Sequence, residues 1–145
     1  GLPDDSHVEM LRTAVDLLDW PHALAERIGI GIAPLADTRF NASKSWLKPL
    51  ELSAVGIPWV ASPSVEYKRL NSVGCGVLAK SPQDWYKMLR FMCRNEWFRR
   101  EESEKGRAVA AELALEKHAW RWWEAWQDAI ELQRKLTPRH SHAVG

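Results

Sequence analysis

The chain has 145 residues, enough for one domain with a sizeable hydrophobic core. Its formal net charge of +1 gives no bulk attraction to nucleic acid or anionic lipid, so any partner must be recognised locally. No apolar run approaches the roughly 20 residues of a membrane span and no signal peptide is present, which indicates a soluble, cytoplasmic protein. The two cysteines, Cys75 and Cys93, lie in unlike contexts, so we expect buried, reduced thiols rather than a disulfide or a metal site.

The first part of the chain predicts a strand, a helical turn and a second strand. Residues 15–20 (VDLLDW) form a short apolar run of strand length, and Pro21 then opens a helical turn in HALAERIG. Residues 30–35 (IGIAPL) are apolar and β-branched and stop at a proline, a pattern typical of a strand that is buried on both faces. The loop ADTRFNASKSW follows this strand.

A helix is expected to begin at Pro49. Proline is tolerated at the first helical position because the backbone N–H that it lacks would be unpaired there. Leu50, Ala54 and Val55 are predicted to form the inner face of this helix, and Gly56 is suited to a left-handed stop.

The pattern then repeats. Residues 59–62 (WVAS) predict a strand, residues 65–70 a short helix, and residues 75–80 (CGVLAK) another apolar strand. Ser81 and Asp84 form a capping box, with a proline between them at the first position of the next helix.

Long helices complete the chain. They are predicted over residues 95–116 and 120–136, so that residues 1–136 form one domain and residues 137–145 a disordered tail. Strands that alternate with helices predict an α/β fold with a mostly parallel sheet. The last helix carries four tryptophans: Trp120, Trp122, Trp123 and Trp126.

In parallel sheets, ligands bind beyond the carboxyl ends of the strands and against helix N-termini. Here that placement selects the loop after residues 30–35 and the first turn of the Pro49 helix, where the helix dipole and unpaired amides near Leu50 and Glu51 favour an anion. Lys44 and Lys48 add positive charge, and the carboxylate of Glu51 can accept hydrogen bonds from sugar hydroxyls. A phosphate next to a polyol is what a nucleotide sugar presents.

Each of these groups also has a structural explanation. Glu51 could only complement the helix dipole, Lys44 and Lys48 could be solvated charges, and the serines could only cap the helix. Three further polar residues of the loop are expected mainly to shape a turn: Asp37, Thr38 and Asn41.

The run IGIAPLADTRFNASKSWLKPLELSAVGIPWVAS, followed by VEYKRLNSVGCGVLAKSPQDWYKML, resembles the C-terminal, donor-binding domain of GT-B glycosyltransferases of the family 4 type. The resemblance covers roughly residues 13–130. It implies a Rossmann-like parallel sheet with flanking helices and transfer of a sugar from a nucleoside diphosphate sugar with retention of anomeric configuration. It implies neither a cofactor nor an obligatory metal.

By this resemblance, Glu51 corresponds to the second glutamate of the family's paired-glutamate motif, which holds the ribose hydroxyls. Ser43 stands at the place of the first glutamate, and the loop before Glu51 corresponds to the segment that faces the donor sugar and diphosphate. No catalytic residue is assigned. The predicted donor-binding residues are Ser43, Lys44, Ser45, Lys48, Leu50 and Glu51.

The resemblance also implies that the chain is the last part of a longer enzyme, truncated at its N-terminal side and inactive alone. The family's acceptor domain and two strands of the sheet would precede Gly1, and the Trp-rich helix would pack across the missing domain. The implied partners are a nucleotide sugar and that domain, with membrane contact only through the absent half and no nucleic acid. The alternative is a non-catalytic α/β interaction module whose binding surface is the Trp-rich helix. A flavodoxin-like regulatory domain ranks last, because the acidic cluster or Gly-rich loop expected of it is lacking.

Overall fold

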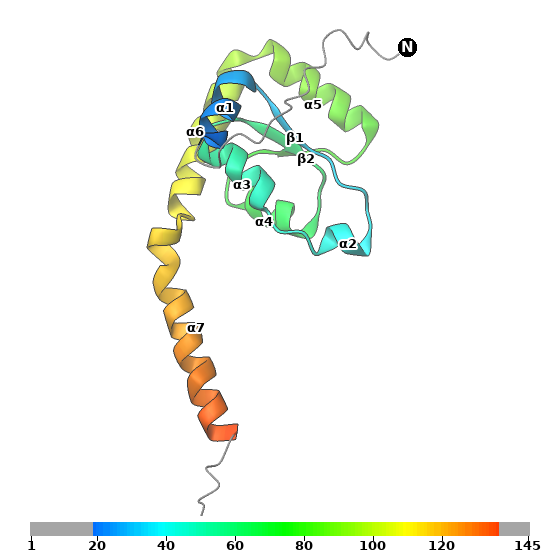
Figure 1. Ribbon diagram of the computed structural model, residues 1–145. Helices are drawn as coiled ribbons and strands as arrows, with labels where there is room; N and C mark the ends of the chain where they lie inside the picture. Colours follow the sequence, from blue (N-terminus) through cyan, green and yellow to red (C-terminus); the bar gives the residue numbers. More distant parts are fainter. Residues whose placement is uncertain (1–18, 137–145) are drawn as a thin grey trace, which may run out of the picture.

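The structure is a computed structural model that describes residues 19–136, and its centre is a small parallel sheet (Figure 1). The strands β1 (Gly31–Ala33), β2 (Trp59–Ala61) and β3 (Val77–Leu78) pair in the order β1-β2-β3. The predicted α/β class with a parallel sheet is therefore confirmed. The helices are α1 (Trp20–Arg27), α2 (Arg39–Ala42), α3 (Leu47–Ala54), α4 (Val65–Ser72), α5 (Pro82–Arg94), α6 (Glu96–Glu112) and α7 (Leu115–Leu136).

The central strand β2 is buried on both faces, because helices cover both sides of the sheet. Trp59 and Ala61 belong to a core cluster that includes Leu52 of α3 and Leu70 of α4. Val60, which lies between Trp59 and Ala61 in the strand, points to the other face and packs with Met92 of α5. This alternation follows from the pleat of a strand, which sends successive side chains to opposite faces.

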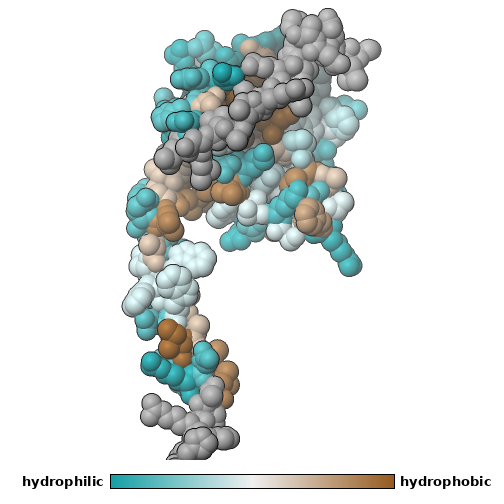
Figure 2. Space-filling model, in the orientation of Figure 1, coloured by the Kyte–Doolittle hydropathy of each residue, from teal (hydrophilic) through white to brown (hydrophobic). Residues whose placement is uncertain are grey.

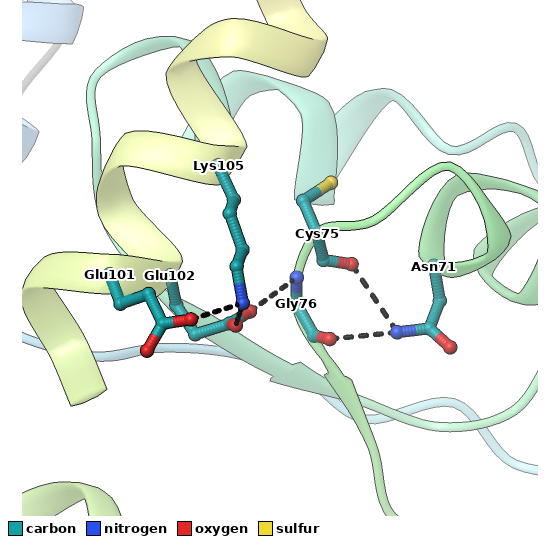
Figure 3. Close-up of polar contacts among 6 residues, drawn as sticks. All are labelled: Asn71, Cys75, Gly76, Glu101, Glu102 and Lys105. Atoms are coloured by element: carbon teal, nitrogen blue, oxygen red, sulfur yellow. Dashed lines mark hydrogen bonds and ion pairs between the residues drawn. The ribbon is translucent and has the colours of Figure 1, made fainter.

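Helix α6 is fastened to the domain by polar contacts at two places. Ser103 Oγ donates a hydrogen bond to the Gly56 carbonyl at 2.6 Å, just after α3. The buried carboxylate of Glu102 accepts the backbone N–H of Gly76 at 3.0 Å and pairs with Lys105 at 3.1 Å (Figure 3). On the other side of the same loop, the Asn71 amide donates to the Gly76 carbonyl at 2.7 Å. The turn before β3 is thus held between α4 and α6.

The start of the described chain differs from the sequence prediction. Trp20, the last residue of the predicted 15–20 strand, opens α1 instead, and residues 15–18 lie outside the described range. The strand predicted at 30–35 contracts to β1, and Ile32 is 54% exposed, so burial on both faces was wrong for this strand. Residues 39–42, expected within a loop, form the short helix α2.

Helix α3 begins two residues earlier than predicted. Leu47 is its first residue, so Pro49 stands third rather than first. The buried residues of α3 are Pro49, Leu52 and Ser53. Of the predicted inner face, Leu50 and Val55 are partly buried and pack against the core, whereas Ala54 is exposed. Proline is compatible with this position because the first turn makes no intrahelical N–H bonds.

The later elements follow the prediction more closely. The capping box of α5 is confirmed, since Ser81 N–H donates to Asp84 Oδ2 at 2.8 Å and Asp84 N–H donates to Ser81 Oγ at 3.1 Å. The strand predicted at 75–80 shrinks to the two residues of β3. Helix α7 begins at Leu115, five residues before the predicted start, and the predicted tail at 137–145 lies outside the described residues.

Helix α7 extends away from the rest of the domain (Figure 1). No residue of α7 is buried, and its four tryptophans are between 55% and 61% exposed. Between residues 19 and 136, no helix combines the length and apolar character needed to cross a membrane. The apolar side chains of α7 are therefore displayed on a helix that projects from the domain.

Candidate functional site: a cavity at the carboxyl ends of the strands

A cavity of about 700 Å³ lies at the carboxyl ends of the three strands. The segments that follow β1, β2 and β3 all contribute to its wall, together with α2 and the starts of α4 and α5. This is where parallel α/β sheets bind ligands, because the strand ends and the helix N-termini converge there. The volume falls within the range of about 300 to 1,000 Å³ that is typical of small-molecule sites.

Hydrogen bonds between the segments fix the wall that follows β1. The backbone N–H of Leu35 donates to Ser62 Oγ at 2.9 Å, which ties the segment after β1 to the segment after β2. The Asn41 amide donates to the Ala36 carbonyl at 2.8 Å, and Thr38 Oγ1 accepts the Asn41 N–H at 3.2 Å. Thr38 and Asn41 therefore shape the turn, as expected, and also line the cavity.

Helix α4 begins at the cavity. Ser64 is its N-cap and accepts the Tyr67 N–H at 3.3 Å, and the first intrahelical bond runs from Lys68 N–H to the Ser64 carbonyl at 3.0 Å. The N–H groups of Val65 and Glu66 precede that bond, so they are the amides that a helix start offers to a ligand. The Lys68 and Lys80 side chains line the same cavity and add positive charge.

The start of α5 contributes a carboxylate to the cavity. The pKa of Asp84 is lowered mainly by the hydrogen bond from the backbone N–H of Ser81, and further by the hydrogen bond with the Ser81 hydroxyl. The Lys80 N–H also donates to this carboxylate at 3.3 Å. Asp84 is therefore ionised at neutral pH. Asp37 also lines the cavity, so its wall combines two carboxylates with the two ammonium groups of Lys68 and Lys80.

The six residues predicted to bind the donor do not line this cavity. Lys48 and Glu51 are exposed on the first turns of α3, and Leu50 is partly buried beside the core. Ser43 and Lys44 directly follow Ala42, which is part of the cavity wall, so the predicted loop runs outward from the cavity.

The contacts of the loop serines and of Lys44 are local. Ser43 Oγ donates to the Phe40 carbonyl at 2.9 Å, and Ser45 Oγ accepts the Leu47 N–H at 3.4 Å. Lys44 Nζ lies over the Phe40 ring, 5.1 Å from its centroid. These contacts shape the loop and leave the Lys44 side chain exposed.

The prediction that unpaired backbone amides surround Pro49 and Leu50 was wrong. Pro49 has no N–H, and the N–H of Leu50 donates to the Trp46 carbonyl at 3.0 Å. The N–H of Leu47 already has Ser45 Oγ as a partner. An anion at the start of α3 would therefore meet few free donors, whereas α4 starts at the wall of the cavity.

Sequence reasoning missed the residues after β2 and β3, above all Ser62, Ser64, Lys68 and Lys80. The signal was available, because Ser64 follows an apolar strand and precedes a helix, which is the pattern of an N-cap. The sequence prediction placed the ligand at the end of the first of these strands, whereas the segments after β1, β2 and β3 all line the cavity.

The cysteines are both free, and only one is buried as predicted. Cys75 is buried and burial raises the pKa of its thiol, whereas Cys93 is exposed on α5. Between residues 19 and 136, no three His, Cys, Asp or Glu side chains are grouped so as to hold a metal ion. No protein-family model, curated protein or solved structure matches the chain.

Proposed function

We propose that the chain is the nucleotide-sugar-binding part of a retaining glycosyltransferase, equivalent to the C-terminal half of a GT-B fold. The observation that supports this most directly is the cavity of about 700 Å³ at the carboxyl ends of three parallel strands. Its mixed lining suits a donor that carries both phosphates and sugar hydroxyls. The resemblance in sequence supports the same function.

In this proposal the diphosphate lies against the start of α4. The first-turn amides of Val65 and Glu66 and the ammonium groups of Lys68 and Lys80 stabilise its negative charge, which increases on the leaving diphosphate as the glycosidic bond breaks. The carboxylates of Asp37 and Asp84 accept hydrogen bonds from the hydroxyls of the transferred sugar. These groups supply the stabilisation that a metal ion provides in other glycosyltransferases, so the proposal requires no metal.

The nucleoside end extends from the cavity toward α3. Glu51, which is exposed on that helix, holds the ribose hydroxyls. In the sequence, Lys44 and Lys48 lie between the cavity wall and Glu51. Ser43, Ser45 and Leu50 shape this segment. The donor thus bridges the cavity and the first turns of α3.

The acceptor and the groups that act on it belong, in this proposal, to a separate N-terminal acceptor domain. This chain alone then binds a donor without transferring its sugar, and any contact with a membrane is made by the acceptor domain. A cytoplasmic location is part of the proposal, supported by two free cysteines.

Isothermal titration of the chain with UDP, GDP and ADP tests the proposal. We expect one of the three to bind, and the Lys80→Ala and Glu51→Ala variants each to weaken that binding by about 10-fold or more, since each removes a hydrogen-bonding charge. Glu104→Ala, an exposed change on α6, is the matched control and should leave the affinity unchanged. The proposal is wrong if the folded chain binds none of the nucleotides, or if Lys80→Ala and Glu51→Ala bind as well as the control does.

A non-catalytic interaction module is the second candidate, and the exposed tryptophans of α7 favour it. Such a module needs no donor in the cavity. The same titration separates the two functions, because an absence of nucleotide binding would leave α7 as the functional surface.

A further inference from the structure

Helix α7 carries an apolar face that no other described part of the chain covers. Apolar positions recur along it at alternating intervals of four and three residues, the spacing of a helix that packs lengthwise against another helix. Trp122, Trp126 and Leu136 of this face are 60%, 59% and 72% exposed. Figure 2 shows brown and near-white side chains along the projecting helix. Six of the seven positions of this repeat are apolar and one, Gln133, is polar: Leu115, Ala119, Trp122, Trp126, Ala129, Gln133 and Leu136.

The apolar face is wider than the repeat alone. Trp123 and Ile130 extend it on one flank, and Ala125 and Leu132 extend it on the other. Trp123 is 61% exposed and Leu132 is 58% exposed. The contact surface of α7 therefore spans its whole length.

The polar face of α7 is electrically balanced. A partner chosen by charge, such as nucleic acid or an anionic membrane, would favour a surplus of basic residues. Instead, the acidic and basic residues of α7 are equal in number, so the partner is selected by apolar shape and two copies of the helix do not repel each other. The acidic residues are Glu116, Glu124, Asp128 and Glu131, and the basic residues are Lys117, Arg121, Arg134 and Lys135.

We propose that α7 pairs with α7 of a second copy of this chain in an antiparallel arrangement. One register matches large side chains to small ones along the contact. It places Trp126 opposite Ala129 of the second copy, Leu136 opposite Ala119, and Trp122 opposite the shorter Gln133. The two-fold symmetry of such a pair repeats each match, and alternating large and small residues is how helices fill a shared core.

The flanking residues agree with the same register. Trp123 of one copy lies beside Ile130 of the other, and Ala125 lies beside Leu132. Glu116 and Arg134 lie at the same edge of the apolar face but at opposite ends of α7. Antiparallel pairing therefore brings the Glu116 end of one helix toward the Arg134 end of the other, at both ends of the contact.

The apolar area available on α7 is sufficient for a stable pair. Without Trp120, the exposed tryptophans, leucines and isoleucine of this face offer on the order of 800 Å² per copy, given the areas that such side chains bury. A standard protein interface buries about 800 Å² on each partner. This surface lies on a different element from the cavity, so the pairing is tested separately from nucleotide binding.

Sedimentation equilibrium of the whole chain tests the pairing, with circular dichroism to verify that each variant keeps its helix content. We expect the native chain to dimerise and Trp126→Glu to weaken the dimer by about 10-fold or more, because it places a charge in the centre of the contact. Trp120→Glu is the matched control, since Trp120 is as exposed but lies about a third of a turn from the centre of the apolar face. A monomeric native chain, or equal effects of the two substitutions, would overturn the proposal.

The register has its own test. Trp126→Ala removes a large side chain that faces Ala129, and Ala129→Trp sets two tryptophans against each other, so each change alone should weaken the dimer. The double variant restores one large and one small residue at each contact and should recover most of the affinity. If the double variant is as weak as the weaker of the single variants, the antiparallel register is wrong.

Discussion

Trp59 lies in the core and contacts both α3 and the turn before β3. Its ring is 1% exposed, and its Nε1–H donates to Ser53 Oγ of α3 at 2.8 Å. Gly76 presses against the ring from the turn before β3, where a Cβ atom would lie 2.2 Å from Trp59. These contacts explain why a polar serine is buried in the apolar core and why the partly buried position against the ring is a glycine.

Gly76→Ala tests the close approach to Trp59. Gly76 has φ of +70°, so alanine there costs about 1 to 2 kcal/mol of backbone strain, and the overlap with the indole adds about 1 to 3 kcal/mol. Gly74→Ala is the control, because Gly74 also has positive φ but has no atom within 4 Å of the added Cβ. Urea denaturation should show that Gly76→Ala lowers the free energy of unfolding more than Gly74→Ala does. Equal losses would mean that the ring moves away without cost.

Ser53→Ala tests the hydrogen bond of the buried indole. The change leaves the Trp59 N–H without an acceptor in the core, which should lower the free energy of unfolding by about 1 to 3 kcal/mol in urea denaturation. Ser72→Ala removes an exposed serine that donates only to the Arg69 carbonyl and should have an effect within about 0.5 kcal/mol. A loss for Ser53→Ala no larger than that of Ser72→Ala would show that the indole finds another partner.

At the residue scale, the sequence predicts that a residue belongs to a helix or a strand more accurately than it predicts the position or the burial of that residue within the element. Pro49 was expected at the first helical position, but any of the first positions suits a residue without an N–H, and the structure places it third. Ile32 was expected to be buried because its neighbours are apolar. It is exposed because it lies on an edge strand, and the order of strands cannot be read from the strand itself.

At the scale of single elements, α5 has the most complete start signal in the chain. Its capping box, its proline and its apolar periodicity were all visible in the sequence, and the structure confirms the helix. The strands were harder to delimit, because β3 is two residues long and the apolar residues Cys75 and Ala79 beside it lie outside the strand. Helix α2 was missed because four residues are too few to show a helical period.

Replacement of Asp84 by asparagine tests the charge at the start of α5. The hydrogen bonds from Ser81 lower the pKa of Asp84 on folding, so the carboxylate contributes stability above the ordinary aspartate pKa of about 4. That contribution disappears as the pH falls through the lowered pKa of the folded state. We therefore expect Asp84→Asn to be less stable than the native chain at pH 7, with the difference narrowing below about pH 4. Urea denaturation at several pH values measures this difference in the free energy of unfolding. A difference that does not change with pH would show that the charge of Asp84 does not stabilise the start of α5.

At the scale of the whole molecule, the chain divides into a packed α/β domain and a projecting helix. The domain includes α6, which contacts α3 and the turn before β3, while α7 contributes no buried residue. The sequence predicted both long helices but not this division, because α6 and α7 are similar in length and amphipathic character. What separates them is the presence of tertiary contacts, which the pattern of a single helix does not encode.

Deletion of α7 tests this division. A chain that ends at Leu113 should keep the fold, with a free energy of unfolding within about 1 kcal/mol of that of the dilute, unpaired full chain, because the deleted side chains are exposed. Urea denaturation followed by circular dichroism makes the comparison. A much larger loss would show that α7 supports the domain.

The candidate site was predicted in part. The sequence placed a ligand at the carboxyl ends of the strands, and the cavity lies there. It assigned the phosphate-binding amides to α3, whereas the helices α4 and α5 begin at the cavity. The predicted residues are neighbours in the chain, whereas the cavity joins segments that are far apart in the sequence.

The distribution of the nine tryptophans has a practical consequence for fluorescence. Trp59 is buried, while Trp97 and the four indoles of α7 are more than half exposed, so the native emission already resembles that of indole in water. Unfolding should shift this emission only slightly, which makes it a poor measure of stability. Quenching by acrylamide should instead report on α7, since whatever covers that helix will shield up to four of the nine indoles at once.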